Sequence, residues 1–212
     1  MAVAVDYNKT DFVKYVFQQK EAEVDAGTHL ASVVKNGNQE LVELLISKDA
    51  DPQLGLEVAV LSGNSIIVAY LIEKGAVVKN PDLLKIASNV KDVQLTKVLL
   101  ETRQINPDSI MIDLIELKDP QLVETNLNYG AQVNSAALTT AIDSKNEAIA
   151  IKLMERAEDS LLTNTLIFNA VQNQMPVVVS HLIDRLNAAD YAYKAALDAK
   201  QADLLELAVT KG

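Results

Sequence analysis

The residue types that most often carry chemistry are sparse in this sequence of 212 residues. It has two histidines, His29 and His181, and no cysteine, which excludes a thiolate metal site and a cysteine nucleophile. Neighbouring carboxylates could bind a cation or share a proton, but on a helix surface they are far more often solvated charges. Two such pairs are Glu158 with Asp159 and Asp113 with Glu116. We therefore expect no catalytic residue, no metal site and no cofactor.

The motifs of common enzyme classes are also missing from the sequence. It contains no H-E-x-x-H zinc motif, no G-x-S-x-G nucleophile turn, no G-x-x-x-x-G-K-[ST] phosphate loop and no D-x-D-x-D-G calcium loop. Its seven glycines leave little material for a loop that cradles a phosphate. We therefore expect a protein that is not an enzyme.

The composition favours a folded, helical chain and limits the class of partner. Hydrophobic residues make up 49% of the sequence, and only 7 Gly, 5 Pro and 4% aromatic residues are available for β-rich folds. The net charge of -10 argues against a nucleic-acid backbone or an anionic membrane as the partner. The N-terminus lacks the basic segment of a signal peptide, and the absence of cysteine agrees with a reducing compartment. We expect a cytoplasmic location.

An internal repeat organises nearly the whole sequence. The segment THLASVVKNGNQELVELLISKDADP (residues 28–52) aligns without a gap to LGLEVAVLSGNSIIVAYLIEKGAVV (residues 54–78), and five further segments keep the same frame. One column of mostly small residues recurs every 26 to 29 positions, at Val33, Ala59, Ala87, Leu114, Ala141, Ala170 and Ala196. A small side chain in this small-residue column would let the next repeat pack closely.

Each repeat contains two apolar segments that are separated by a short polar turn. The apolar residues within 65–73 recur at helical spacing, which predicts a helix, a turn and a second helix in each repeat. Neighbouring repeats must stack because one helix pair cannot bury its own apolar face. We expect a single repeat domain over residues 1–212, with a partial N-terminal cap at 1–27 and about seven helix pairs at 28–212.

These features resemble the ankyrin repeat, whose pattern runs T-P-L-H-x-A, a G-H or G-N turn, V-V-x-x-L-L and G-A-x-V-N. The matching turns are Gly37-Asn38 and Gly63-Asn64, and later matches are Gly75-Ala76 and Gly130-Ala131-Gln132-Val133-Asn134. The ankyrin period is about 33 residues, and the shorter repeats here retain both helical patterns. The resemblance therefore implies an all-α, ankyrin-like solenoid of stacked helix-turn-helix repeats with short or absent β-hairpin fingers.

The resemblance also implies where a partner protein would bind. Ankyrin contacts lie two and three residues after the small-residue column, on the concave face. The equivalent residues here are Lys35, Asn36, Leu61, Ser62, Asn89, Val90, Glu116, Leu117, Asp143, Ser144, Gln172, Asn173, Asp198 and Ala199. The alternative interpretation is that these residues are merely solvent-exposed helix ends.

We expect a monomeric protein-interaction module that binds a protein or peptide on this face. Residues 101–151 contain eight acidic and three basic residues, which suggests a basic partner, although acidity also serves solubility. Similar arrays occur in scaffold modules and in effectors that intracellular bacteria deliver into host cells. An effector acting on host proteins, in the host cytosol, is therefore one alternative function, and a compact all-α enzyme or regulator is another.

Overall fold

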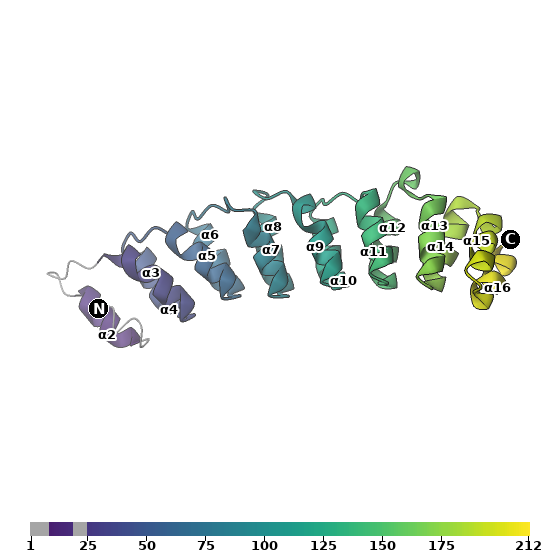
Figure 1. The fold of residues 1–212 in the computed structure, drawn as a ribbon. Coiled ribbons are helices and arrows are strands. Elements are labelled where there is room, and N and C mark those ends of the chain that lie inside the picture. Colours follow the sequence, from purple (N-terminus) through teal and green to yellow (C-terminus); the bar gives the residue numbers. More distant parts are fainter. Residues whose placement is uncertain (1–8, 19–24) are drawn as a thin grey trace. The chain divides into compact units, whose positions relative to one another are not determined.

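The fold is built from short helices that follow one another in pairs (Figure 1). The computed structural model describes residues 9–18 and 25–212, so residues 1–8 and 19–24 of the expected N-terminal cap lie outside the described part. The described residues form α-helices and two short 3-10 helices, and they contain no strand. The chain divides into two compact units, Met1–Asn106 and Pro107–Gly212.

Unit 1 contains the helix α2, which packs on α4, and three helix pairs. Its helices are α2 (Thr10–Gln18), α3 (Ala26–Lys35), α4 (Gln39–Ile46), α5 (Gln53–Leu61), α6 (Ser65–Glu73), α7 (Asp82–Asn89) and α8 (Val93–Glu101). The first helices of successive pairs contact each other, α3 with α5 and α5 with α7. The pairs of this unit therefore stack in the order of the sequence.

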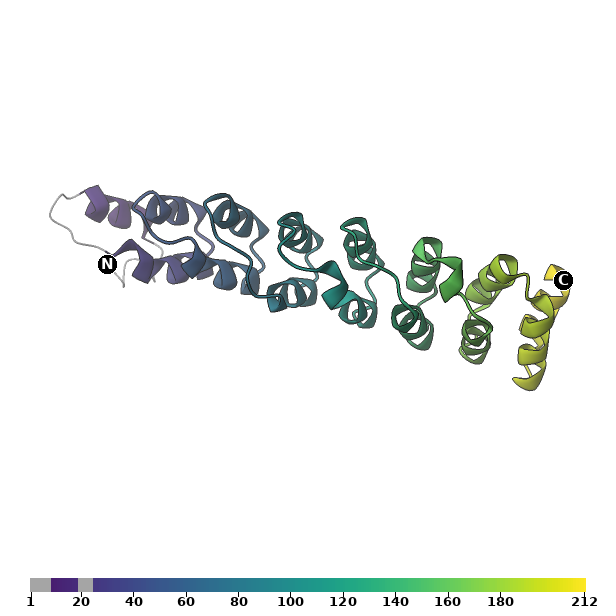
Figure 2. The ribbon, with the colours of Figure 1, turned by 90° about the horizontal axis from the view of Figure 1, so that it is seen from above.

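Unit 2 contains four helix pairs and two 3-10 segments. Its helices are η1 (Pro107–Ile110), α9 (Met111–Glu116), α10 (Pro120–Asn128), α11 (Ser135–Asp143), α12 (Glu147–Arg156), η2 (Asp159–Leu161), α13 (Asn164–Gln172), α14 (Pro176–Leu186), α15 (Ala189–Asp198) and α16 (Ala202–Lys211). First helices contact first helices and second helices contact second helices along this unit. Figure 2 shows the two helices of each pair side by side, with the pairs of a unit one behind another.

This arrangement confirms the expected all-α fold of stacked helix pairs. The segments that join successive pairs are short and contain no strand within the described residues, as the short repeat period predicts. The assignment of residues 1–212 to a single domain stays a prediction.

The small-residue column lies in the core, where first helices of successive pairs meet. All seven of its members are completely buried: Val33, Ala59, Ala87, Leu114, Ala141, Ala170 and Ala196. Gly55, one turn before Ala59 in α5, allows an even closer approach. A Cβ atom added to Gly55 would lie 3.0 Å from Val34 Cγ2 and 3.1 Å from Leu71 Cδ1. A side chain at this position would therefore require its neighbours in α3 and α6 to shift by a few tenths of an ångström.

The turn inside each helix pair has one residue in the left-handed backbone region. Two of these residues are Gly37 (φ 68°) and Gly63 (φ 69°), which adopt this conformation without strain. The other five carry side chains: Lys91, Lys118, Lys145, Gln174 and Lys200, all with φ between 55° and 57°. In five of the seven turns the next residue is an Asn or Asp that accepts a hydrogen bond from the first turn of the second helix, as in Asn64 Oδ1 with Ile67 N (3.0 Å).

We expect Lys145→Gly to stabilise the protein by about 0.5–1 kcal/mol. A left-handed conformation costs a residue with a Cβ about 1–2 kcal/mol, and glycine removes this cost. The net stabilisation is smaller, because glycine makes the unfolded chain more flexible. Urea unfolding measures the change, and Lys145→Ala is the control because it removes the charge but keeps the Cβ. Equal stability of the Gly and Ala variants would contradict strain at this turn.

Candidate protein-interaction surface

The predicted binding residues of unit 1 gather at the C-terminal ends of α3, α5 and α7. They are Lys35, Asn36, Leu61, Ser62, Asn89 and Val90, and all six are exposed. Because α5 contacts both α3 and α7, these helix ends are neighbours. We call these six residues the unit 1 edge.

The predicted residues of unit 2 occupy the same places on its first helices. They are the last residues of α9, α11, α13 and α15 and the C-cap residues that follow them: Glu116 and Leu117, Asp143 and Ser144, Gln172 and Asn173, and Asp198 and Ala199. The first residue of each pair is exposed and the second is half-buried. We call these eight residues the unit 2 edge.

The unit 1 edge is mainly uncharged and partly apolar. Leu61 and Val90 are both exposed large hydrophobic residues. A Cβ atom added to Gly63 would lie 3.0 Å from Val90 Cγ1, so Val90 lies against the turn that follows Leu61. Lys35 supplies the one charged side chain of this edge. The surface therefore offers an apolar contact area beside a cation.

The unit 2 edge carries three exposed carboxylates, and a lysine of the adjoining turn follows each of them by two residues. These combinations are Glu116 with Lys118, Asp143 with Lys145 and Asp198 with Lys200. Each lysine is in the left-handed conformation described above. Sequence reasoning assigned the acids to the binding surface but not the lysines, although the recurring acid-x-Lys spacing was visible. The edge is therefore a surface of mixed charge.

The second helices carry three ion pairs that join one repeat to the next. Lys152 Nζ lies 2.5 Å from Glu124 Oε2, and Lys211 Nζ lies 2.5 Å from Asp184 Oδ2. Lys14 pairs with Glu40 in unit 1 in the same way. The hydrogen bond from Lys152, together with its positive charge, lowers the pKa of Glu124.

The edge carboxylates take no part in these pairs. Among the described residues, no salt bridge involves Glu116, Asp143 or Asp198. Ion pairs therefore neutralise some charges of the second helices, whereas none neutralises the three carboxylates of the unit 2 edge among the described residues.

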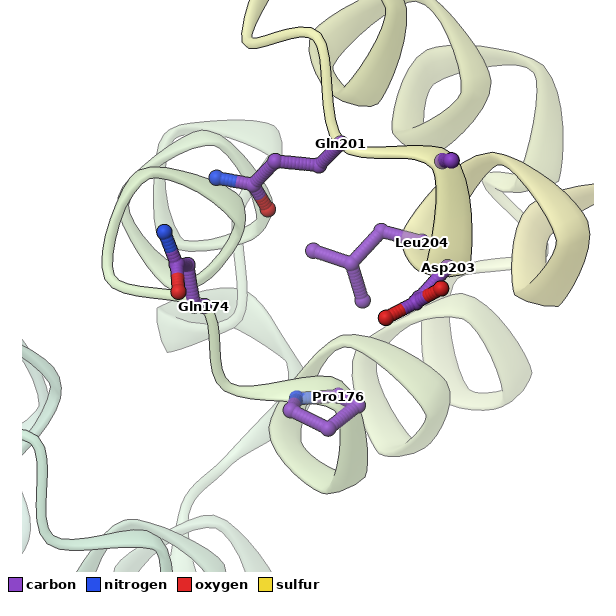
Figure 3. Close-up of a pocket in the computed structure, with 6 residues that line it drawn as sticks. Gln174, Pro176, Gln201, Asp203 and Leu204 are labelled. Atoms are coloured by element: carbon purple, nitrogen blue, oxygen red, sulfur yellow. The ribbon is translucent and has the colours of Figure 1, made fainter.

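A hollow of about 370 Å³ lies between the last two turns of unit 2 (Figure 3). The side chains of Gln174 and Gln201 line it from the two neighbouring turns, together with Pro176, Ala202, Asp203 and Leu204. Gln201 is the N-cap residue of α16, but its side chain makes no capping hydrogen bond, and its buried Oε1 has no hydrogen-bond partner among the described residues. The hollow follows Gln172 and Asn173 of the unit 2 edge in the chain and is lined by the amide side chains of Gln174 and Gln201.

The histidines lie in different units. His29 is in α3 and His181 is in α14, and both are half-buried. The Nε2 atom of His181 is buried and has no partner in the described part of the chain. Over residues 9–18 and 25–212, no three His, Asp or Glu side chains are grouped so that they could hold a metal ion. Nor does that part contain a helix with the length and apolar character needed to cross a membrane.

Comparison with known proteins gives one family match and structural likenesses. Residues 1–82 match the sequence family described as ankyrin repeats (three copies). One similar solved structure is the human ASB11 ankyrin repeat domain, at 15% sequence identity and a TM-score of 0.41, covering 86% of this chain and 83% of that chain. No curated protein sequence matches this chain.

Proposed function

Because residues 1–82 match the ankyrin-repeat family, we propose that this chain is a non-catalytic module that binds a partner protein through the exposed ends of its first helices. Ankyrin repeats are in general protein-interaction modules. The observation that supports these edges as the contact surface is the distribution of charge pairs. Three ion pairs join second helices of successive repeats, whereas the carboxylates of the unit 2 edge have no salt bridge among the described residues.

The partner of the unit 2 edge is a protein segment with regularly spaced basic side chains. Neighbouring packed helices lie about 8–10 Å apart, and an extended chain advances about 3.3 Å per residue. A basic residue at every third position would therefore meet successive first helices, at Glu116 on α9 and Asp143 on α11. The turn lysines would contact carboxylates or backbone carbonyl groups of the same segment. The unit 1 edge would add apolar contacts through Leu61 and Val90.

We expect the double variant Glu116→Lys, Asp143→Lys to bind its partner about tenfold more weakly, because two attractive contacts become repulsive. Partners captured from cell lysate and identified by mass spectrometry provide the ligand, and titration of the purified partner measures the affinity. Binding of the unchanged protein should also weaken as salt rises, since salt screens exposed charges.

The matched control is Glu155→Lys, Glu206→Lys, which changes the net charge equally at exposed positions on second helices. Loss of binding only in the edge variant supports the proposal. Unchanged affinity of the edge variant, or equal loss in the control, would show that the unit 2 edge is not the contact surface.

A further inference from the structure

The two turns that line the hollow of unit 2 differ from the other turns inside helix pairs. In five of the seven turns, the residue before the second helix is an Asn or Asp whose side chain accepts a hydrogen bond from that helix. The remaining two turns have Met175 before α14 and Gln201 before α16, and neither side chain makes a capping hydrogen bond. The hollow lies between these two turns.

Gln201 keeps an acceptor that the shorter side chains of the other turns use locally. Asn146, for example, accepts a hydrogen bond from Ile149 N at 3.1 Å. The Oε1 atom of Gln201 is buried and has no partner among the described residues, and Figure 3 shows it directed into the hollow. A buried acceptor without a partner is unfavourable. A ligand that donates a hydrogen bond to this oxygen would therefore bind favourably.

The other side chains that line the hollow define which donor fits. Among the described lining residues, Asp203 supplies the one charged group, and no salt bridge of the described chain involves it. Gln174 adds a second amide, while Pro176 and the buried Leu204 provide apolar surface (Figure 3). The lining thus favours a cation that also carries apolar atoms.

An arginine side chain meets these requirements. Its planar guanidinium group carries five N–H donors, so it can donate to Gln201 Oε1 and to the carboxylate of Asp203 together. Its apolar stem can lie against Leu204 and Pro176. The volume of about 370 Å³ is at the lower end of the range of about 300–1,000 Å³ for ligand sites, which suits one long side chain.

We propose that the hollow binds the side chain of an arginine in the partner segment. It rests on the proposed function for the source of this arginine. A segment that passes α9 and α11 next reaches α13, which contacts α11 and ends at Gln172 where those helices end at carboxylates. The lining of the hollow begins two residues later, at Gln174, and supplies the carboxylate of Asp203 that this helix end lacks.

Acetyl-arginine methylamide is the probe, and its citrulline analogue is the control because it has a similar shape but no charge. In the NMR spectrum of the ¹⁵N-labelled chain, the arginine probe should shift the side-chain amide of Gln201 and the backbone amides of Ala202 and Leu204. One side chain makes few contacts, so we expect a dissociation constant of the order of 1–10 mM. Absence of these shifts, or equal binding of the citrulline analogue, would overturn the proposal.

Gln201→Asn tests the role of the unpaired oxygen. The shorter side chain should cap α16 as Asn146 caps α12, which keeps the helix and withdraws the oxygen from the hollow. Because a hydrogen bond to a charged donor is lost, the arginine probe should bind about tenfold more weakly. Gln121→Asn alters an exposed amide of α10 and should leave probe binding unchanged. Undiminished binding of the probe by Gln201→Asn would contradict the proposal.

Titration with the purified partner tests whether the arginine belongs to it. Gln201→Asn should weaken partner binding about tenfold, whereas Gln121→Asn should not. Failure of the proposed function is seen separately, because Glu116→Lys, Asp143→Lys leaves the lining of the hollow unchanged and should still bind the arginine probe. Unchanged partner affinity of Gln201→Asn would show that the hollow does not hold an arginine of the partner.

Discussion

Leu71→Ala is expected to lower the free energy of unfolding by about 2–5 kcal/mol. Leu71 lies in α6, is completely buried, and its Cδ1 atom approaches the backbone of α5 at Gly55. Removing most of the side chain loses its transfer free energy and leaves a cavity between two helices whose backbones cannot easily close it. Urea unfolding followed by circular dichroism measures the change.

Asp143→Ala is the matched comparison for Leu71→Ala. Asp143 is the last residue of α11, is exposed, and has no salt bridge among the described residues. We expect its replacement to change stability by no more than about 0.5 kcal/mol. Equal effects of the two substitutions would show that the buried and exposed columns of the repeat have been assigned incorrectly.

Gly55→Val is expected to destabilise the protein by about 1–3 kcal/mol, the usual cost of overpacking. Glycine inside a helix normally costs about 1 kcal/mol relative to alanine, so a helix-propensity argument alone would favour its replacement. The Cβ position at Gly55 lies 3.0 Å from Val34 Cγ2, 3.1 Å from Leu71 Cδ1 and 3.3 Å from Leu30 Cγ. Three buried neighbours must therefore move to admit the valine.

A double-mutant cycle tests this cause, because Leu71→Ala removes one of the three neighbours. Gly55→Val should cost less in the Leu71→Ala background than in the unchanged protein, with a coupling free energy of about 0.5–3 kcal/mol. The control is Ala148→Val at an exposed position of α12. Additive effects of Gly55→Val and Leu71→Ala would show that the two sites are not in steric conflict.

The buried residues of each helix pair could be predicted from the sequence because the same pattern of small and apolar residues recurs in every repeat. The small-residue column appears seven times at nearly constant spacing, and all its members are buried, including the larger Val33 and Leu114. Apolar periodicity also identified the two helices of each pair. One repeat alone would not have shown that the small residue is required for packing, since Ala is also a common residue in isolated helices.

The left-handed turns could be predicted only where glycine marks them. Gly37 and Gly63 gave that signal, whereas Lys118 and Lys145 adopt the same conformation without a residue type that favours it. The packing of the two helices against each other sets the backbone of these turns.

The exposure of Leu197 and Val209 was not predicted because repeat alignment assigns burial by column. Leu197 and Val209 occupy columns that are buried in the earlier pairs of unit 2, so the sequence pattern classes them as core. Burial at these positions depends on a further helix pair, and periodicity within one repeat contains no information about its neighbour. The ion pair of Glu124 with Lys152 escaped notice for a similar reason, since its partners lie 28 residues apart.

The one-repeat spacing of these ion pairs limits how the chain can change in length. A deletion of one residue within a helix rotates the side chains that follow it in that helix by about 100°. The buried residues and the paired charges would then both leave their positions. Loss or duplication of a whole helix pair instead leaves each remaining second helix beside another of the same kind, so a partner for Glu124 on the next second helix can be kept. Insertions and deletions in related sequences should therefore be multiples of a complete pair, or fall in the segments that join pairs.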